Sequence, residues 1–180
     1  MLYTYKELLE EYKTQYNIST LISSGKIHKV DDKIYSDQAF TPKLAILTKR
    51  YPDAIVTMNS AFYYYSLTDD IPIHYYLVSK RNGTKIKDKQ VIQTFEIAET
   101  FELGKEHMIV DGVNINIYSK ERLLIELVRN KRKLPFDYYK EIISNYRKLV
   151  EQMDIWRIEE YSSKMYRGDY IMDTLQMEVF

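Results

Sequence analysis

The sequence lacks cysteine, is poor in glycine (five residues) and proline (four residues), and carries no excess of either charge. Without cysteine, the chain can form no disulfide scaffold, no cysteine-containing zinc site and no thiol nucleophile. Hydrophobic residues make up 45% and charged residues 29% of the 180 positions, which excludes collagen, a coiled-coil rod and wholesale disorder. The length fits one mid-sized domain, or a small module joined to a larger one.

Long apolar runs are absent as well, since no stretch approaches the roughly 18 uninterrupted apolar residues of a membrane span. The first seven residues include no apolar signal segment. We therefore expect a soluble cytoplasmic protein with no membrane partner. Twenty-six basic residues balance 26 acidic ones, so any nucleic-acid face must be a local feature of the surface.

The N-terminal segment predicts two helices followed by a hairpin. Thr4 with Glu7 three residues later is a capping box and predicts a helix over about 5–12. A second amphipathic helix follows and stops at Gly25, a natural helix C-cap. Residues 26–35 favour two short strands around an Asp-Asp-Lys turn. This order is the outline of a winged helix-turn-helix.

The remainder of the chain mixes strand and helix signals. Thr41 before Pro42 predicts a helix N-cap with proline at the first helical position. Val113, Ile115 and Ile117 alternate with asparagines after an Asp-Gly turn of type I′, which predicts a hairpin. Further strands are expected at 54–57, 75–78 and 91–97. Helices are expected at 60–66, 155–166 and 170–178, and two more should begin at 119 and at 136. The last two helices should be separated by a break at 167–169.

A long apolar stripe follows Pro135 at helical spacing and is expected to face a core. Its members are Phe136, Tyr139, Ile142, Ile143, Tyr146, Leu149, Val150 and Met153. The sequence thus predicts an α+β protein: a winged helix-turn-helix domain at 1–37 and a mixed sheet-and-helix C-terminal domain at 38–180 that ends in helices.

Catalytic signatures are missing, including phosphate-loop, dinucleotide-binding, zinc-protease and hydrolase motifs. The three histidines lie far apart in the sequence, and paired acids such as Asp31-Asp32 point in different directions on a strand. We expect no catalysis, no cofactor and no metal. A metal-dependent nuclease stays a third alternative, and it requires His74, Asp111 or Glu121 to converge on a metal.

Residues suited to DNA surround the second helix and the hairpin. A recognition helix enters the major groove while a wing contacts phosphates, so polar side chains on the helix and lysines on the wing are the right residue types. The candidate DNA-binding residues are Lys13, Gln15, Asn17, Ser19, Thr20, Lys26, Lys29 and Lys33.

Two further segments concentrate positive charge and form a candidate second basic patch. They comprise Lys80, Arg81, Lys85, Lys87 and Lys89, and Arg129, Lys131, Arg132 and Lys133. Each is either a solvated loop or, if both lie on one face, a contact for nucleic acid or an acidic partner. Residues 151–180 carry seven acids and three bases, which argues against a phosphate-binding surface in this segment.

Taken together, the order of these motifs resembles the AbiEi-like antitoxins of bacterial abortive-infection type IV toxin-antitoxin systems. The resemblance rests on the wing from Gly25 to Tyr35, the segment 56–72, the strand 76–78, and the strand 113–118 with the helix 121–127 after it. Two departures from the family pattern stand out: Lys33 occupies a wing position that is usually glycine, and Tyr65-Ser66-Leu67 replaces His-Gly-Leu.

The resemblance implies a DNA-binding antitoxin and transcriptional autorepressor, acting in phage defence. Its partners would be the operator DNA of its own operon and a nucleotidyltransferase-like toxin encoded beside it, opposed directly or through the toxin's target. The alternative is a protein-interaction module whose winged helix packs on a partner instead of DNA. Antitoxin activity that survives deletion of residues 1–37, without operator binding, would identify that alternative.

Overall fold

The computed structural model describes all residues from 1 to 180, which form two compact units. The N-terminal unit comprises Met1–Asp53 together with Asp111–Asn114, and the C-terminal unit comprises Ala54–Val110 and Ile115–Phe180. The division by packing therefore falls after residue 53, whereas the sequence places the domain boundary at 37/38. Both units combine helices with a sheet, so the chain is α+β and ends in helices, as the sequence predicts.

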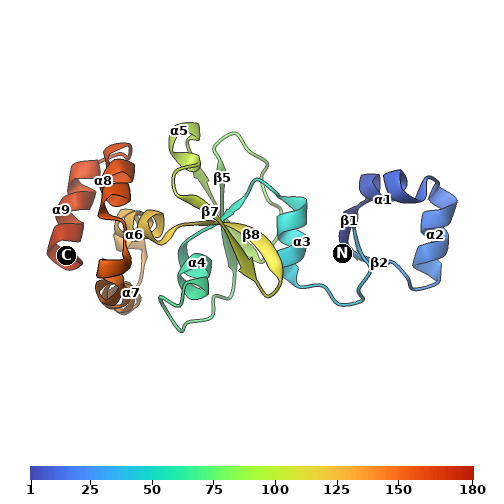
Figure 1. Cartoon of the computed structure of the whole chain (residues 1–180), viewed down its shortest axis with the longest axis horizontal. Coiled ribbons are helices and arrows are strands. Elements are labelled where there is room, and N and C mark those ends of the chain that lie inside the picture. Colours follow the sequence, from blue (N-terminus) through green and yellow to red (C-terminus); the bar gives the residue numbers. More distant parts are fainter. The chain divides into compact units, whose positions relative to one another are not determined.

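The N-terminal unit, drawn in blue in Figure 1, contains a three-stranded antiparallel sheet. Its strand order is β1-β3-β2. Its elements are β1 (Leu2–Thr4), α1 (Tyr5–Tyr12), α2 (Gln15–Ser23), β2 (His28–Asp31), β3 (Ile34–Ser36) and α3 (Lys43–Arg50). The two predicted helices and the hairpin are confirmed, and so is the capping box between Thr4 and Glu7. The strand β1 was not predicted, because three residues are too few to show an alternating pattern.

A small core joins the first two helices to the hairpin. Leu8, Ile18 and Ile27 are almost completely buried, and tyrosines pack around them. Each of these three residues comes from a different segment, so burying them fixes how α1, α2 and the start of the hairpin pack together. The predicted cap of α3 is wrong: the helix begins at Lys43, Pro42 occupies the cap position, and the hydroxyl of Thr41 is buried without a partner.

The C-terminal unit contains a mixed five-stranded sheet with the order β6-β5-β4-β8-β7. The strands are β4 (Ile55–Val56), β5 (Tyr75–Lys80), β6 (Val91–Glu96), β7 (Lys105–Val110) and β8 (Val113–Tyr118). Strand β5 runs parallel to β6 and antiparallel to β4, and β4 runs parallel to β8. Asp111 and Gly112 both have positive φ angles, as a type I′ turn requires, so the predicted β7–β8 hairpin is confirmed.

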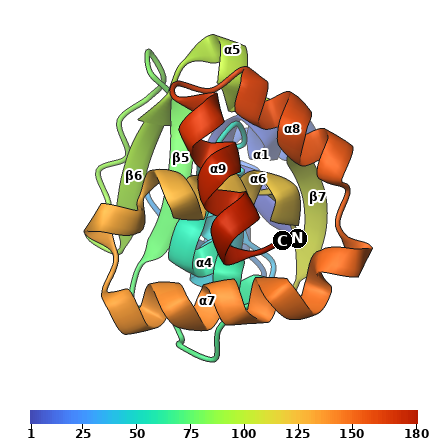
Figure 2. The same cartoon turned by 90° about the vertical axis from the view of Figure 1, so that its left-hand side faces the viewer.

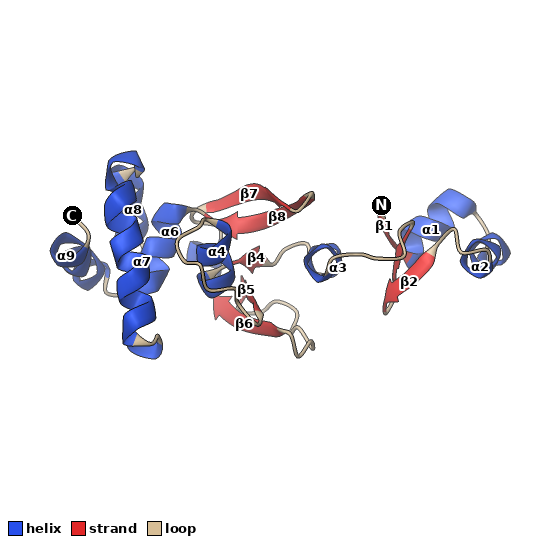
Figure 3. Cartoon of the chain, turned by 90° about the horizontal axis from the view of Figure 1, so that it is seen from below, coloured by secondary structure: helices blue, strands red, loops and turns tan.

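Helices α6 to α9 gather on one side of this sheet (Figures 2 and 3). The helices are α4 (Met58–Tyr64), α5 (Ala98–Phe101), α6 (Lys120–Arg129), α7 (Phe136–Leu149), α8 (Ile155–Ser163) and α9 (Gly168–Glu178), with short 3₁₀ turns η1 (Lys131–Lys133) and η2 (Val150–Gln152). Helix α6 is buried along most of its length and lies at the centre of this helical layer. No helix has both the length and the apolar character needed to cross a membrane.

Two details of the helical layer differ from the prediction. Phe136 is 69% exposed, because it is the first residue of α7 and lies outside the stripe that Tyr139, Ile142, Ile143 and Tyr146 bury. The break between the last two helices comes earlier than expected: α8 ends at Ser163 and α9 already begins at Gly168. The short helix α5 was not predicted.

Candidate nucleic-acid interface

The second helix of the N-terminal unit buries one side and leaves the other free. Thr14 caps its N-terminus by accepting the N–H of Asn17 at 3.2 Å, and Ile18 anchors it in the core. The predicted residues Gln15, Ser19 and Thr20 are exposed. Gln15 and Ser19 lie about one helical turn apart, and Thr20 lies about 100° further round, so together the three side chains span the wide exposed face of α2. That face of α2 offers amide and hydroxyl groups for base edges and phosphate oxygens.

Asn17 has a structural role that its sequence position did not reveal. Its side-chain N–H group donates to the carbonyl of Tyr12 at 2.9 Å, which ties the start of α2 to the end of α1. Lys13, between the two helices, adopts φ +66°, a conformation that glycine usually supplies. The turn therefore has a defined geometry, in which Asn17 is partly occupied while the Lys13 side chain stays exposed.

Tyr16 is a candidate contact that the sequence reasoning missed. Its side chain is 79% exposed on the same side of α2 as Ser19 and Thr20. The signal was present, since Ser19 and Thr20 follow it at the i+3 and i+4 spacing of one helical face. An exposed tyrosine can stack on a base or donate to a phosphate, so we add it to the interface.

The lysines of the hairpin lie on its exposed surface. Lys26 follows Gly25, Lys29 lies on β2, and Lys33 lies in the turn with φ +57°. All three side chains are exposed and none forms an ion pair in the structure, and the same holds for Lys13. The structure thus brings α2 and the lysine-bearing hairpin together in one small unit.

The acids of the hairpin are paired with helix α3, a fact that no sequence pattern indicated. Arg50 lies 3.2 Å from a carboxylate oxygen of Asp31 and 3.5 Å from one of Asp32, and Lys43 lies 3.9 Å from Asp31. Arg50 also donates to the carbonyl of Asp32 at 3.1 Å. Because α3 neutralises these carboxylates, they do not cancel the neighbouring charge of Lys33.

A similar pairing neutralises the first helix. Lys49 lies 2.7 Å from Glu7, whose carboxylate also accepts the N–H of Thr4 at 2.6 Å. The hydrogen bond from Lys49, followed by the one from the Thr4 backbone, lowers the pKa of Glu7 to about 2. Helix α3 therefore places cations against acids from both α1 and the hairpin.

The first segment of the second basic patch is an ordered loop that joins the parallel strands β5 and β6. Gln93 on β6 accepts the N–H of Ile86 at 2.8 Å and donates to the carbonyl of Thr84 at 2.9 Å. Ile86 is 8% exposed, so the middle of the loop is packed down. The neighbouring cations Lys85 and Lys87, together with Arg81 and Lys89, are exposed and form no ion pair.

Three of the predicted patch residues have other partners. Lys80 lies 3.4 Å from Glu102 and over the ring of Phe101, and Lys131 is paired with Glu178. Arg129 lies 2.7 Å from Glu96 and 2.6 Å from Glu126. These ion pairs reduce the charge available to a phosphate, whereas Arg132 and Lys133 are exposed and form no ion pair.

Arg129 belongs to a buried ion cluster that also contains Arg122, Glu96 and Glu126. Arg122 is completely buried, and its guanidinium lies 2.9 Å from Glu126, 3.2 Å from Glu96 and 4.4 Å from the ring centroid of Tyr118. Burial alone would raise the pKa of Glu96, but the hydrogen bond and charge of Arg129 outweigh burial and lower it. The two arginines balance the two carboxylates, so the cluster has no net charge.

The ion cluster lines a pocket of about 230 Å³ next to the edge strand β6. Lys133 and Asn130 close one side of the pocket, and Thr94 and Phe95 of β6 close the other. Lys133 therefore lies on the face of β6 that carries Thr94, whereas the β5–β6 loop is held by Gln93, whose side chain points to the opposite face of the strand. Figure 3 shows this loop on the side of the sheet away from the helical layer. The unpaired parts of the two basic segments thus flank β6 on opposite faces of the sheet and do not form one surface.

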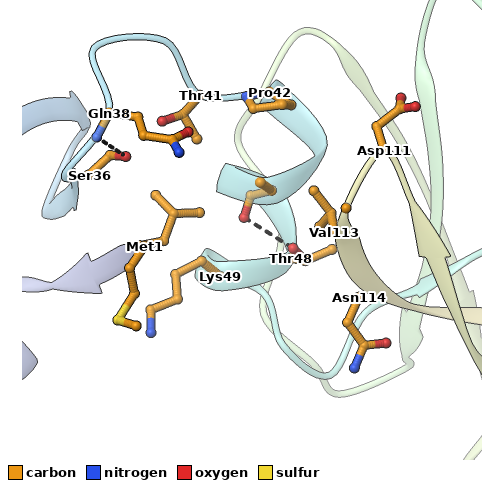
Figure 4. Close-up of a pocket in the computed structure, with 13 residues that line it drawn as sticks. Met1, Ser36, Gln38, Thr41, Pro42, Thr48, Lys49, Asp111, Val113 and Asn114 are labelled. Carbon is orange, nitrogen blue, oxygen red and sulfur yellow. Dashed lines mark hydrogen bonds between the residues drawn. The ribbon is translucent and has the colours of Figure 1, made fainter.

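A larger pocket of about 570 Å³ lies in the N-terminal unit and contains none of the predicted DNA-binding residues. Ser36, Gln38, Thr41, Thr48 and Lys49 are among the residues that line it (Figure 4), and the Lys49 amine is hydrogen-bonded to Glu7. No group of three histidine, aspartate or glutamate side chains comes together in a way that could hold a metal ion.

Comparison with known proteins gives no independent family assignment, since no protein-family model and no curated protein matches the sequence. The resemblance to AbiEi-like antitoxins therefore stays a prediction.

Proposed function

We propose that the N-terminal unit is a winged helix-turn-helix that binds DNA, within a DNA-binding antitoxin and autorepressor of a type IV toxin-antitoxin operon. In this proposal α2 enters the major groove, with Gln15, Tyr16, Ser19 and Thr20 facing the bases and backbone. Lys26, Lys29 and Lys33 contact phosphates from the hairpin.

The observation that carries the DNA-binding proposal is the pairing of the hairpin acids with α3. By sequence, residues 1–36 have no net charge, which argues against a phosphate-binding surface. In the structure, Arg50 and Lys43 neutralise Asp31 and Asp32, while the lysines beside them stay exposed and unpaired. The hairpin therefore presents positive charge locally although the segment is neutral overall.

Two backbone conformations support the resemblance that suggests the antitoxin role. Lys33 and Ser66 stand where the family pattern has glycine, and they adopt φ +57° and φ +55°. Non-glycine residues rarely adopt positive φ, because the Cβ atom then crowds the backbone. Both positions keep the conformation for which a glycine is the usual choice, despite carrying a side chain.

In this proposal the C-terminal unit counteracts a nucleotidyltransferase-like toxin, bound directly or opposed through its target. The unpaired cations Arg81, Lys85, Lys87 and Lys89 of the β5–β6 loop form a second DNA contact, which does not extend to Lys133 on the other face of β6. The chain itself performs no catalysis.

A gel-shift assay with the promoter DNA of the chain's own operon tests the DNA-binding proposal. The wild-type chain should bind this DNA more tightly than an unrelated duplex of equal length. The triple variant Lys26→Ala, Lys29→Ala, Lys33→Ala should bind both DNAs more weakly. Equal affinity of the wild type and this variant would contradict the assignment of the hairpin.

Co-expression with the neighbouring nucleotidyltransferase-like toxin tests the antitoxin role separately. The wild-type chain should restore growth, and the triple lysine variant should do so too if neutralisation resides in the C-terminal unit. Failure of the wild-type chain to restore growth would contradict the antitoxin role while leaving DNA binding unaffected.

A further inference from the structure

A second pocket in the C-terminal unit, of about 410 Å³, has no part in the proposed DNA binding. It lies between the loop that joins α4 to β5 and the start of α7, which lie side by side in Figure 2. Asn59, Asp70, His74, Tyr76 and Tyr138 are among the residues that line it. Its volume falls within the range of ligand pockets.

Hydrogen bonds between backbone groups and the hydroxyls of Ser60 and Thr68 hold the walls of this pocket in place, and none of them uses a charged side chain. Ser60 accepts the N–H of Tyr76 at 2.9 Å and donates to the carbonyl of His74 at 3.3 Å, which fixes the start of β5 against α4. Thr68 accepts the N–H of Asp70 at 3.1 Å and fixes the loop. The pocket is therefore formed before any ligand arrives.

The lining groups favour a positively charged ligand. Asp70 is the one lining residue with a full charge at neutral pH, and it forms no ion pair. Tyr76 and Tyr138 also line the pocket, and the face of an aromatic ring attracts cations. Burial, and then the charge of Asp70, raises the pKa of Tyr138, so the Asp70 carboxylate acts on this wall. The amide oxygen of Asn59 is buried without a partner, which adds to the negative potential of the wall.

The rim of the pocket favours a polypeptide over a small free cation. Ile71 and Ile73 line the pocket and are 74% and 89% exposed. Apolar side chains exposed on both sides of a proline are expected to pack on the residues that flank a charged group in a peptide.

We propose that this pocket binds an arginine side chain of a partner polypeptide, with the guanidinium beside Asp70 and between the two tyrosine rings. A guanidinium suits the site because it pairs with a carboxylate and stacks on aromatic faces at once. Apolar residues next to the arginine would contact Ile71 and Ile73. This proposal does not depend on DNA binding.

The test is a titration of the full chain with the capped peptide acetyl-Leu-Arg-Leu-amide. During the titration, NMR records the chemical shift of the His74 ring protons. The chain has three histidines, and a His74→Asn variant assigns the signal. The neutral, nearly isosteric citrulline peptide is the ligand control. Asp70→Asn is the test variant, and Asp69→Asn is its matched control, because Asp69 is the neighbouring exposed carboxylate that does not line the pocket.

The arginine peptide should shift the His74 signal and bind at least about tenfold more tightly than the citrulline peptide, since citrulline keeps N–H donors but lacks the positive charge that pairs with Asp70 and is attracted by aromatic rings. Asp70→Asn should remove this preference, and Asp69→Asn should change it less than about twofold. Equal binding of the two peptides by the wild-type chain, or no binding of either, would overturn the proposal irrespective of how the variants fold. A preference that persists in Asp70→Asn would also overturn it.

Discussion

Replacing Arg50 by alanine is expected to weaken DNA binding, although Arg50 contacts no DNA in the proposed complex. Arg50 lies within 3.5 Å of carboxylate oxygens of both Asp31 and Asp32. Without it, these carboxylates lose their principal partner and attract the neighbouring Lys29 and Lys33. A lysine held by a carboxylate no longer neutralises a phosphate.

The size of this effect follows from counterion release. Each lost phosphate contact lowers the slope of log K against log salt by about 0.9 and costs about eightfold in affinity at 0.1 M salt. Capture of one hairpin lysine thus predicts about eightfold weaker binding, and capture of both predicts about 60-fold. The change in folding stability should be about 1 kcal/mol or less, because these ion pairs are partly exposed.

Fluorescence anisotropy with labelled promoter DNA measures this effect. Arg157→Ala is the matched control, because Arg157 also pairs with two carboxylates, Glu106 and Asp154, but lies in the C-terminal unit outside both basic patches. Adding Asp31→Asn and Asp32→Asn to Arg50→Ala should restore binding. The reasoning fails if folded Arg50→Ala binds within twofold of the wild type, or if Arg157→Ala weakens binding equally.

Three further predictions concern stability and are measured by chemical or thermal unfolding. Arg122→Met should destabilise the chain by about 3–5 kcal/mol, since it leaves the carboxylates of the buried ion cluster with one cation; a loss below about 1 kcal/mol would contradict this role. The lowered pKa of Glu7 implies that its carboxylate stabilises the fold fully above about pH 4.5 and that this stabilisation is lost as the pH falls through about 2. Glu7→Gln should remove this part of the pH dependence of the unfolding free energy. The same pH dependence in the variant and the wild type would refute this prediction. Ser66→Gly should stabilise the chain by roughly 0.5–1 kcal/mol by relieving a positive φ, whereas Ser24→Gly, at φ −82°, should not; equal effects would show that no strain is relieved.

Much of the local structure followed from short-range sequence signals. The capping box at Thr4 and the Asp-Gly turn at residue 111 each involve neighbours in the chain, and both formed as predicted. Thr41 did not cap α3, because Pro42 itself takes the cap position and the backbone then leaves the Thr41 hydroxyl buried. A cap pattern identifies a helix start but not the residue that ends up at the cap.

The candidate site depended on contacts that the sequence could not show. Arg50 and Asp31 are 19 positions apart, and Arg129 reaches Glu96 across 33 positions. A list of lysines and arginines therefore treats free and paired cations alike. The structure separates them: the hairpin lysines and the loop cations Lys85, Lys87 and Lys89 form no ion pair, whereas Arg129 is paired within the buried ion cluster.

The salt dependence of DNA binding tests the central claim most directly. Affinity for promoter DNA is measured between about 0.05 and 0.2 M salt for the wild-type chain and for the Lys26→Ala, Lys29→Ala, Lys33→Ala variant. The control is a Lys6→Ala, Lys148→Ala, Lys164→Ala variant, which removes the same charge outside the proposed interface. If all three hairpin lysines contact phosphates, the slope should fall in magnitude by about 2.7 in the hairpin variant and stay unchanged in the control. Equal slopes for the wild type and the hairpin variant would contradict the account.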